Sequence, residues 1–273
     1  MIGRKLRGTL PADLWRTAHA LADAARPATL QHFRSQALDV SSKNALHFDP
    51  VTVADRAAEA AIRSTLARLR PQDGMLGEEL GAQAGVSGLT WIVDPIDGTR
   101  GYLSGTPTWG VLIALADESG PILGVIDQPY IGERFWGGLG EAAATGPHGR
   151  TKLSTRPPRP LAQAVLFTTF PEIGTDAERA AFERVRDWVR LVRFGMDCYA
   201  YALIAAGQID LVIEAGLRAY DIAAPIAVIE AAGGIVTDWQ GGAAHHGGQV
   251  IAAANRAIHA EALEVLNGSS GGA

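Results

Sequence analysis

Two carboxylates stand at the end of an apolar segment in the run Trp91-Ile-Val-Asp-Pro-Ile-Asp-Gly-Thr99. The apolar residues predict a short buried strand over Leu89 to Val93, so Asp94 and Asp97 would both leave the same strand end. An ordinary alternative is that Asp94 caps a helix and Asp97 lies in a solvated turn. A metal site is the better interpretation only if acids from other segments join this pair.

Three further acids occupy positions from which they could join it. Glu78 follows a short predicted strand, although two adjacent glutamates usually form a solvated turn. Asp55 lies in the first turn of a helix predicted over Thr52 to Leu69, where it could accept a hydroxyl proton or simply favour the helix dipole. Asp221 precedes an apolar helix and follows the strand predicted over Ile209 to Ile213, and an N-cap is an equally ordinary role.

The chemistry of these residues indicates that they bind a hard divalent cation and an anion. Magnesium prefers carboxylate, carbonyl and water oxygens, and a useful site draws acids from several chain segments. The backbone amides of Gly98 and Thr99 follow the paired acids directly and could face a phosphate at the start of a helical turn. The sequence therefore predicts a place where a metal ion and a phosphate group meet.

The elements that must position these residues alternate along the chain. Apolar spacing predicts an amphipathic helix over Asp13 to Ser35. Two strands joined by a turn are predicted over Trp109 to Ala116 and Ile122 to Asp127. The stretch from Gly137 to Pro160 is rich in glycine and proline, which suggests a weakly packed connection between two lobes.

After this connection, predicted strands and helices alternate, which suggests an α/β layered lobe. The strands are expected at Ala164 to Thr169 and Ile209 to Ile213, and the helices at Asp176 to Trp188, Tyr199 to Gly207 and Ile222 to Ala232. We expect an α+β lobe with most metal ligands at residues 1–143, an α/β lobe that completes the site at residues 144–266, and a flexible tail at residues 267–273.

Composition restricts the class of protein further. The 273 residues are 47% hydrophobic, enough for a large core, and 29 acidic against 24 basic residues give no general attraction for nucleic acid. A single cysteine, Cys198, cannot form an internal disulfide, which agrees with a reducing compartment. No apolar run is long enough to span a membrane, and no signal peptide is evident. We expect a cytoplasmic protein that binds neither membrane nor nucleic acid.

Taken together, the motifs Gly77-Glu-Glu79, Trp91 to Arg100 (WIVDPIDGTR) and Ala219 to Pro225 (AYDIAAP) resemble those of the inositol monophosphatase family. The resemblance runs from Asp49-Pro-Val-Thr-Val-Ala-Asp55 to the glycine-rich stretch ending at Asp238, and so covers most of the chain. Members of this family are metal-dependent, lithium-sensitive phosphatases of small metabolites. The resemblance implies a layered αβαβα sandwich of α/β class, usually a homodimer, acting on a small phosphorylated metabolite.

The resemblance also implies a role for each matching residue. The metal ligands would be Glu78, Asp94, the backbone carbonyl of Ile96, Asp97 and Asp221. Glu78, Thr99 and Asp55 would form the catalytic set, and the amides of Gly98 and Thr99 would hold the phosphate. Two or three Mg²⁺ ions per site would activate a water for in-line attack and stabilise the departing alkoxide, without a covalent phosphoenzyme.

Within the family, several stretches look most like the bacterial histidinol-phosphate phosphatase branch, among them Arg193 to Tyr201 and Glu214 to Asp221. Inositol-specific members have a small residue two positions after the glycine that matches Gly195, where this chain has Asp197. The predicted substrate-binding residues are Gly195, Asp197 and Glu214, whose two acids could pair with the cationic leaving group of L-histidinol phosphate. A helix cap is the alternative role of Asp197.

Three other functions remain open at this point. An inositol-1-monophosphatase or a 3′-phosphoadenosine 5′-phosphate phosphatase would share every metal ligand and differ only in the substrate pocket. A metabolite-binding pseudo-phosphatase should have lost at least one of the motif residues, and none is lost. We therefore predict a phosphoric monoester hydrolase of histidine biosynthesis.

Overall fold

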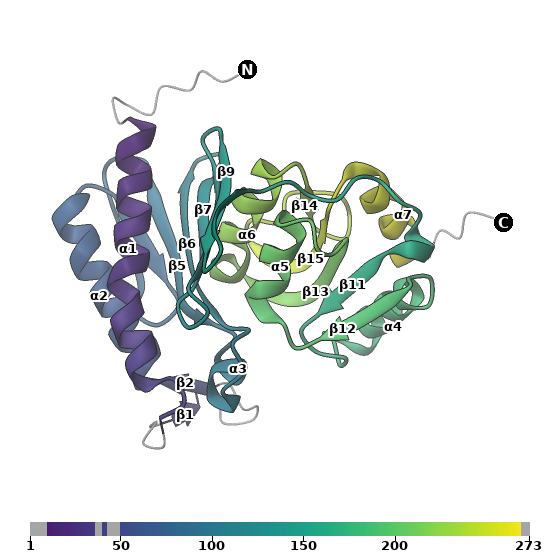
Figure 1. Cartoon of the computed structure of the whole chain (residues 1–273), viewed down its shortest axis with the longest axis horizontal. Coiled ribbons are helices and arrows are strands. Elements are labelled where there is room, and N and C mark those ends of the chain that lie inside the picture. Colours follow the sequence, from purple (N-terminus) through teal and green to yellow (C-terminus); the bar gives the residue numbers. More distant parts are fainter. Residues whose placement is uncertain (1–9, 36–39, 43–49, 269–273) are drawn as a thin grey trace.

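A computed structural model describes residues 10–35, 40–42 and 50–268 of the chain. Five layers follow one another in the order helices, sheet, helices, sheet, helices (Figure 1). The αβαβα sandwich expected from the family resemblance is therefore confirmed. Asp49, where the resemblance begins, and residues 269–273 of the expected tail lie outside the described residues.

The first layer contains α1 (Pro11–His32) and α2 (Val53–Leu69), close to the bounds predicted for both helices. Buried residues of α1 recur at helical spacing and pack on the first sheet together with those of α2. A capping box begins α2, because the Thr52 hydroxyl accepts the Asp55 N–H and the Asp55 carboxylate accepts the Thr52 N–H. The sequence pattern was therefore sufficient to predict both helices of this layer.

The first sheet has eight strands in the order β10-β9-β8-β7-β6-β5-β3-β4. Its strands are β3 (Gly74–Gly77), β4 (Gly81–Gln83), β5 (Thr90–Asp97), β6 (Gly110–Asp117), β7 (Gly120–Gln128), β8 (Glu133–Gly138), β9 (Glu141–Gly146) and β10 (Gly149–Lys152). The short helix α3 (Thr99–Ser104) follows β5, and β1 (Val40–Ser42) pairs with β2 (Pro50–Thr52) apart from the sheet. The strand pair predicted before and after Asp117 is present as β6 and β7.

The interpretation of Gly137 to Pro160 as a weakly packed connection is wrong as far as Lys152, because β8, β9 and β10 continue the sheet there. Gly137 serves close packing rather than a loop. A Cβ added at Gly137 would lie 2.7 Å from the Cα of Val228 in the neighbouring helix. The proposed lobe boundary at residues 143/144 falls inside β9, and the division into lobes stays a prediction.

The middle layer consists of α5 (Asp197–Ala205) and α6 (Ala219–Ala231), whose apolar residues pack in one cluster with β6 of the first sheet and β13 and β15 of the second. The second sheet has the order β12-β11-β13-β15-β14. Its strands are β11 (Val165–Thr168), β12 (Leu191–Phe194), β13 (Leu211–Arg218), β14 (Ile235–Thr237) and β15 (Gly247–Ala253).

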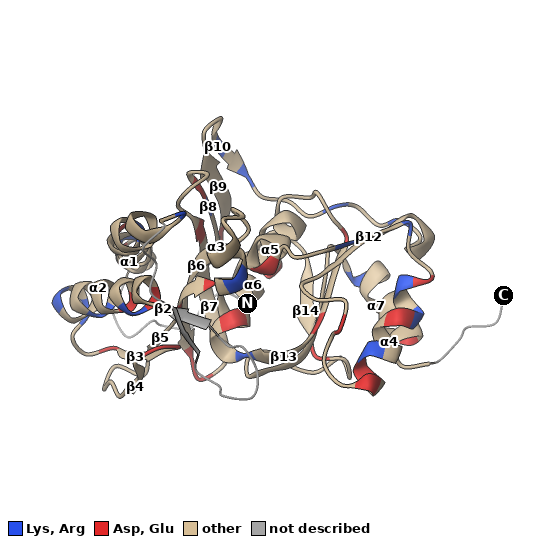
Figure 2. Ribbon diagram, turned by 90° about the horizontal axis from the view of Figure 1, so that it is seen from below, with Lys and Arg blue, Asp and Glu red and all other residues tan. Residues whose placement is uncertain are grey.

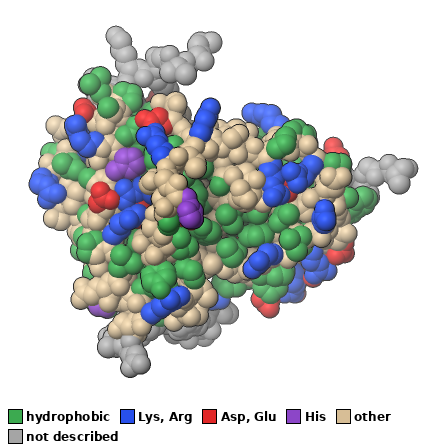
Figure 3. All heavy atoms as spheres, viewed as in Figure 1, with side chains coloured by type: hydrophobic (Ala, Val, Ile, Leu, Met, Phe, Trp, Pro, Cys, Tyr) green, Lys and Arg blue, Asp and Glu red, His purple; other side chains and the backbone are tan. Residues whose placement is uncertain are grey.

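The last layer consists of α4 (Asp176–Arg186) and α7 (Arg256–Leu266), which pack on the outer face of the second sheet with the 3-10 turn η1 (Leu161–Gln163). The predicted strands and helices of this half are present with shifted ends, whereas β12, β14, β15 and α7 were not predicted. Basic side chains are scattered over both halves on the face that Figure 3 shows. Across the described part of the chain, every helix is too short or too polar to span a bilayer.

Candidate active site

Three carboxylates from two elements converge between the sheets. Asp94 and Asp97 lie among the last four residues of the strand β5, and Asp221 lies in the first turn of α6. One carboxylate oxygen from each of the three lies within 4.8 Å of the others. In Figure 2, acidic segments of α5 and α6 lie near α3, which directly follows β5. Carboxylate oxygens at such separations are a suitable set of ligands for a hard divalent cation.

The end of β5 explains how two acids from one strand reach the same point. The strand continues past Val93, where the sequence predicted its end, and its pairing with β6 is irregular between Asp94 and Asp97. Asp94 Oδ1 accepts the Ile96 N–H at 3.0 Å, which closes a local turn. Gly98 then adopts a φ of +86°, a value that favours glycine, and α3 begins.

Backbone groups hold the other two acids of the cluster. Asp97 Oδ2 accepts the Cys198 N–H of α5 at 2.7 Å. Asp221 Oδ2 accepts the Arg218 N–H at 2.7 Å; Arg218 is the N-cap of α6, so the N-cap role considered for Asp221 is wrong, and Asp221 instead bonds back to the N-cap from the first turn. Each of these acids therefore has one oxygen fixed by the protein, which orients the other without neutralising its charge.

Burial and mutual repulsion raise the free energy of this cluster when its carboxylates are ionised. Burial raises the pKa of Asp94 well above its usual value, and Glu78 and Asp97 raise it further. Burial also raises the pKa of Asp97, with further increases from Asp221 and Asp197. Because Glu78 acts on Asp94 in this way, the expected fourth ligand lies beside the cluster. A bound cation would relieve both effects at once.

Glu59 of α2 positions Glu78 and was not found from the sequence. Its side chain is fully buried and accepts the Glu79 N–H at 2.7 Å and the Leu80 N–H at 3.2 Å. A Cβ on Gly77 would lie 2.0 Å from Glu59 Oε1, so only glycine leaves room for this carboxylate. Glu59 forms an ion pair with Arg63 at i+4, and in the sequence this spacing is typical of an ordinary pair on a helix surface. The sequence therefore gave no sign of the role of Glu59.

The expected catalytic pair of Thr99 and Asp55 is not joined by a hydrogen bond at Asp55 Oδ1, which has no partner among the described residues. The Thr99 hydroxyl donates instead to the Ile96 carbonyl at 3.2 Å. Asp55 Oδ2 accepts the Thr52 hydroxyl at 2.5 Å as part of the capping box. The capping role is therefore present, and one buried oxygen of Asp55 remains an acceptor without a donor.

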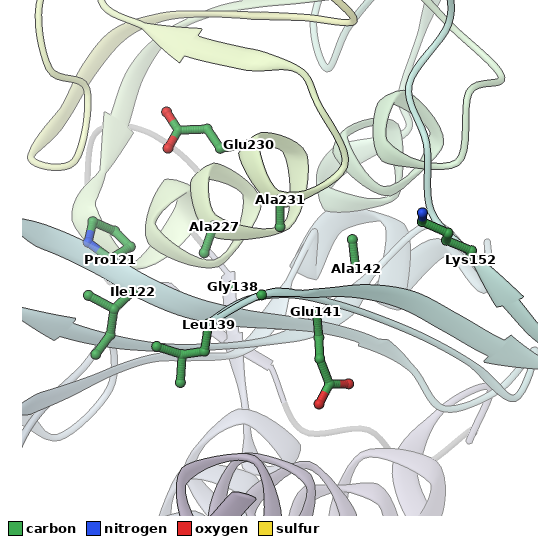
Figure 4. A pocket seen from close by; sticks show the side chains of 11 residues that line it. Pro121, Ile122, Gly138, Leu139, Glu141, Ala142, Lys152, Ala227, Glu230 and Ala231 are labelled. Atoms are coloured by element: carbon green, nitrogen blue, oxygen red, sulfur yellow. The ribbon is translucent and has the colours of Figure 1, made fainter. Parts of the chain in front are cut away.

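A cavity of about 330 Å³, here called the site cavity, contains these groups. Its lining includes every metal-ligand candidate together with the amide-bearing turn, namely Glu78, Asp94, Ile96, Asp97, Gly98, Thr99 and Asp221. Asp55 does not line it. A second cavity of about 420 Å³ lies between the turns of the first sheet and α6 (Figure 4), but the carboxylates of Glu141 and Glu230 point away from each other there. Of these two cavities in the described part of the chain, the site cavity is the one in which several carboxylates converge.

Two more acids line the site cavity, and both were predicted to bind substrate. Burial raises the pKa of Asp197 to about 6, while the Thr108 hydroxyl and Arg100 lower it. Burial raises the pKa of Glu214 to about 7, although its Oε1 accepts both the N–H and the hydroxyl of Thr169. Both acids are therefore ionised in mildly alkaline solution and poised to accept a positive partner.

Gly195, the third predicted substrate residue, does not line the site cavity. Its N–H donates to the Thr169 carbonyl at 3.0 Å, and its φ of +78° turns the chain toward Asp197. Asp197 itself has a φ of +45°, which is unusual for a residue with a side chain. Sequence reasoning missed Phe170 and Tyr201 as parts of the wall, and it left open the role of Arg100, which also lines the cavity. Tyr201 and Arg100 stand close to motif residues, but nothing in the sequence marks Phe170.

The fold and the acidic cluster are those of an α/β enzyme whose carboxylates could hold a metal ion, and comparison with known proteins identifies the family. The inositol monophosphatase family matches residues 11–270. The chain is 41% identical over 264 residues to "Bifunctional phosphatase IMPL2, chloroplastic" of Arabidopsis thaliana, covering 91% of this chain and 73% of that protein. It is 38% identical over 251 residues to a histidinol-phosphatase of Mycobacterium tuberculosis, covering 91% and 96%.

Among solved structures, an inositol monophosphatase from Zymomonas mobilis superposes with a TM-score of 0.84 at 37% identity, over 95% of this chain and 99% of that one. The chain belongs to the inositol monophosphatase family and is a phosphatase, that is, a phosphoric monoester hydrolase. The resemblance to the histidinol-phosphate branch is confirmed as well. Small phosphorylated molecules are the substrates of this family, and the acidic cluster could hold a metal ion.

Proposed function

We propose that the protein hydrolyses L-histidinol phosphate to L-histidinol and phosphate with the aid of Mg²⁺, and so acts in histidine biosynthesis. The observation that carries this proposal is the presence of Asp197 and Glu214 in the same cavity as the acidic cluster. Neither acid belongs to the cluster of Asp94, Asp97 and Asp221. They are therefore available to a leaving group that carries a positive charge.

The donor set suits Mg²⁺ better than a softer metal. The residues that would hold two or three ions are Glu78, Asp94, Asp97, Asp221 and, through its carbonyl, Ile96, all of which offer oxygen. Cys198 is the one thiol nearby, and burial raises its pKa well above the usual value, so it is not a thiolate ligand. When bound, Mg²⁺ supplies Lewis-acid chemistry to the phosphate and makes a nearby water more acidic.

The protein's own groups would do the remaining work. The amides of Gly98 and Thr99 would hold phosphate oxygens at the turn that follows β5. Glu78 would accept the proton of the attacking water, since it lines the cavity beside Asp94. The Thr99 hydroxyl would orient the Ile96 carbonyl, to which it donates. The unpartnered Asp55 Oδ1 would accept a second hydrogen bond once substrate and water are in place.

Charge complementarity distinguishes the proposed substrate from its main rival. Histidinol carries an amine and an imidazole, which can be protonated near neutral pH, whereas an inositol ring offers only hydroxyls. A carboxylate pair beside the leaving group favours the cation and gives a neutral ring only ordinary hydrogen bonds. Inositol 1-phosphate is the second candidate, supported by the similar inositol monophosphatase structure from Zymomonas mobilis.

The experiment that tests this proposal measures Mg²⁺-dependent phosphate release from L-histidinol phosphate, myo-inositol 1-phosphate and 3′-phosphoadenosine 5′-phosphate. The expected result is the highest kcat/KM for L-histidinol phosphate, with no turnover when a chelator removes the metal. A higher kcat/KM for either other substrate would reject the substrate assignment and retain the phosphatase. Equal rates with and without metal would reject the role of Mg²⁺.

Two further parts of the proposal have tests of their own. A homodimer in the cytoplasm is expected from the family resemblance and from the single cysteine, which is buried. Light scattering on the purified protein would give the molar mass in solution, and a monomer at working concentrations would reject the dimer. Fractionation of the source cells would test the location.

A further inference from the structure

Phe170 is an exposed aromatic side chain on the wall of the site cavity, and nothing in the proposed mechanism accounts for it. It leaves 42% of its surface open and follows the end of β11 by two residues. Most large hydrophobic side chains of this protein lie inside the clusters between the layers. An aromatic ring that stays open inside a ligand cavity is a candidate contact for the ligand.

The backbone around Phe170 is fixed to the acid that we assign to the leaving group. Glu214 Oε1 accepts the Thr169 N–H at 3.0 Å and the Thr169 hydroxyl at 2.7 Å. The residue before Phe170 is therefore tied to the Glu214 carboxylate, and the ring projects from the same side of the cavity. A leaving group that pairs with Glu214 would be brought close to this ring.

Arg100 fixes the ring from the opposite half of the fold. Its guanidinium carbon lies 4.6 Å from the centroid of the Phe170 ring, a distance typical of a cation–π contact. Arg100 belongs to α3, which follows β5 of the first sheet, so this contact crosses the cavity wall between the two sheets. A planar cation, the Arg100 guanidinium, thus already packs on this ring, and 42% of the Phe170 surface stays open beside it.

The charges around the ring favour a single positive charge on the ligand. Asp197 and Glu214 contribute two negative charges when ionised, and Arg100, whose charge acts on Asp197, contributes one positive charge. Among these three residues the acids outnumber the base, and the other acids of the same cavity, Asp221 among them, add to the negative side. An aromatic surface next to net negative charge is the combination that recognises a flat cation.

We propose that Phe170 forms the surface on which a planar, positively charged leaving group packs, and that it determines substrate specificity together with Asp197 and Glu214. This inference rests on the proposed phosphatase reaction and adds a feature of shape to it. The leaving group should be an aromatic heterocycle that can carry a proton, joined by a short chain to the phosphate ester. A leaving group that is neither flat nor charged gains nothing from the ring.

The test compares Phe170→Leu with the wild-type protein on three phosphate esters. The leaving group of L-histidinol phosphate contains a flat imidazole that can be protonated and a positively charged amine, that of phenyl phosphate is flat and neutral, and that of myo-inositol 1-phosphate is neither flat nor charged. Leucine keeps an apolar side chain and removes only the ring. We expect kcat/KM to fall about tenfold for L-histidinol phosphate, by less for phenyl phosphate, and by less than about twofold for inositol 1-phosphate.

Trp188→Leu is the matched control, since Trp188 is 54% exposed and does not line the site cavity. It should leave all three kcat/KM values unchanged, and Phe170→Trp should restore most of the lost preference. A uniform loss on all three esters, or no loss on any, would overturn the role of Phe170. The wild-type ranking of the three esters tests the proposed function separately, because the selectivity of Phe170→Leu is read against each ester's own wild-type rate.

Discussion

Replacing Asp197 with asparagine isolates the charge on which recognition of histidinol phosphate depends. Asparagine keeps the size of the side chain and an oxygen that can still accept the Thr108 hydroxyl, now 3.3 Å from Asp197 Oδ2. Asp197 lies directly against the proposed phosphate turn, because a Cβ added at Gly98 would lie 2.8 Å from the Asp197 Cβ. The carboxylate can therefore reach a cation a few bonds away from the ester oxygen.

The size of the effect follows from this position. Two opposite unit charges about 5 Å apart attract by about 3 kcal/mol at an effective dielectric constant of about 20. Desolvation of the cation cancels part of this attraction, and hydrogen bonds to charged groups retain about 1.5–3 kcal/mol. Asp197→Asn should then lower kcat/KM for L-histidinol phosphate by about tenfold or more. For inositol 1-phosphate, which offers no charge, the change should stay below about threefold.

The assay is initial-rate phosphate release with saturating Mg²⁺ at about pH 8, above the pKa of about 6 for Asp197 and about 7 for Glu214. Glu230→Gln is the control, since Glu230 is an exposed acid that lines the second cavity and not the site cavity. Glu230→Gln should leave kcat/KM unchanged for both substrates. An equal loss on both substrates in Asp197→Asn would refute charge recognition and leave Asp197 with a structural role.

Three shorter predictions concern the same site. Asp94→Asn should abolish Mg²⁺-dependent turnover while the circular dichroism spectrum stays native, and retained activity would refute its role as ligand. Burial raises the pKa of Asp197 to about 6 and of Glu214 to about 7, so between pH about 4 and 7 the folded protein binds more protons than the unfolded one. In a chelator the Tm should therefore fall as pH rises through this range, and Mg²⁺ should raise it again; a flat profile would contradict the assigned burial. The Tyr201 hydroxyl is buried without a hydrogen-bond partner among the described residues, so Tyr201→Phe should stabilise the protein by about 1 kcal/mol in urea unfolding.

The control for Tyr201→Phe is Tyr199→Phe, two residues earlier in α5. The Tyr199 hydroxyl donates to Glu133 of β8, so its loss should lower the stability of the fold. Opposite changes in the free energy of unfolding are expected from two chemically identical substitutions. A loss of stability in both variants would mean that the Tyr201 hydroxyl has a partner, such as an ordered water.

The acids of the cluster stand in local motifs, but the resemblance to the inositol monophosphatase family implied that they would meet. Asp94 and Asp97 follow an apolar run that predicts a buried strand, and Asp221 stands at the start of an apolar helix. From these patterns alone each acid could equally have been a cap or a solvated turn residue. The structure brings one carboxylate oxygen of each of the three within 4.8 Å of the others.

Residues whose roles depend on the packing of distant segments could not be predicted. Gly137 looked like part of a loop, yet it allows β8 to pack against α6. Asp127, fully buried in β7, accepts hydrogen bonds from Arg26, 101 residues away, and from Arg134. No spacing rule connects Arg26 with Asp127, because this pair forms only when the α1 layer meets the sheet, whereas Arg134 faces Asp127 from the neighbouring strand β8. Phe170 was missed for the same reason, since its contact with Arg100 joins two halves of the fold.

The burial of the cluster has a consequence for how the site works. Folding brings Asp94, Asp97 and Asp221 together from two elements, and the raised pKa values of Asp94 and Asp97 indicate that the protein alone does not stabilise their charges. The same residues could have been placed in solvent at a lower cost. Burial is useful only if a cation completes the cluster, and the cation then binds strongly because the acids have no better partner. Metal binding and folding should therefore be linked, so that a change which weakens one weakens the other.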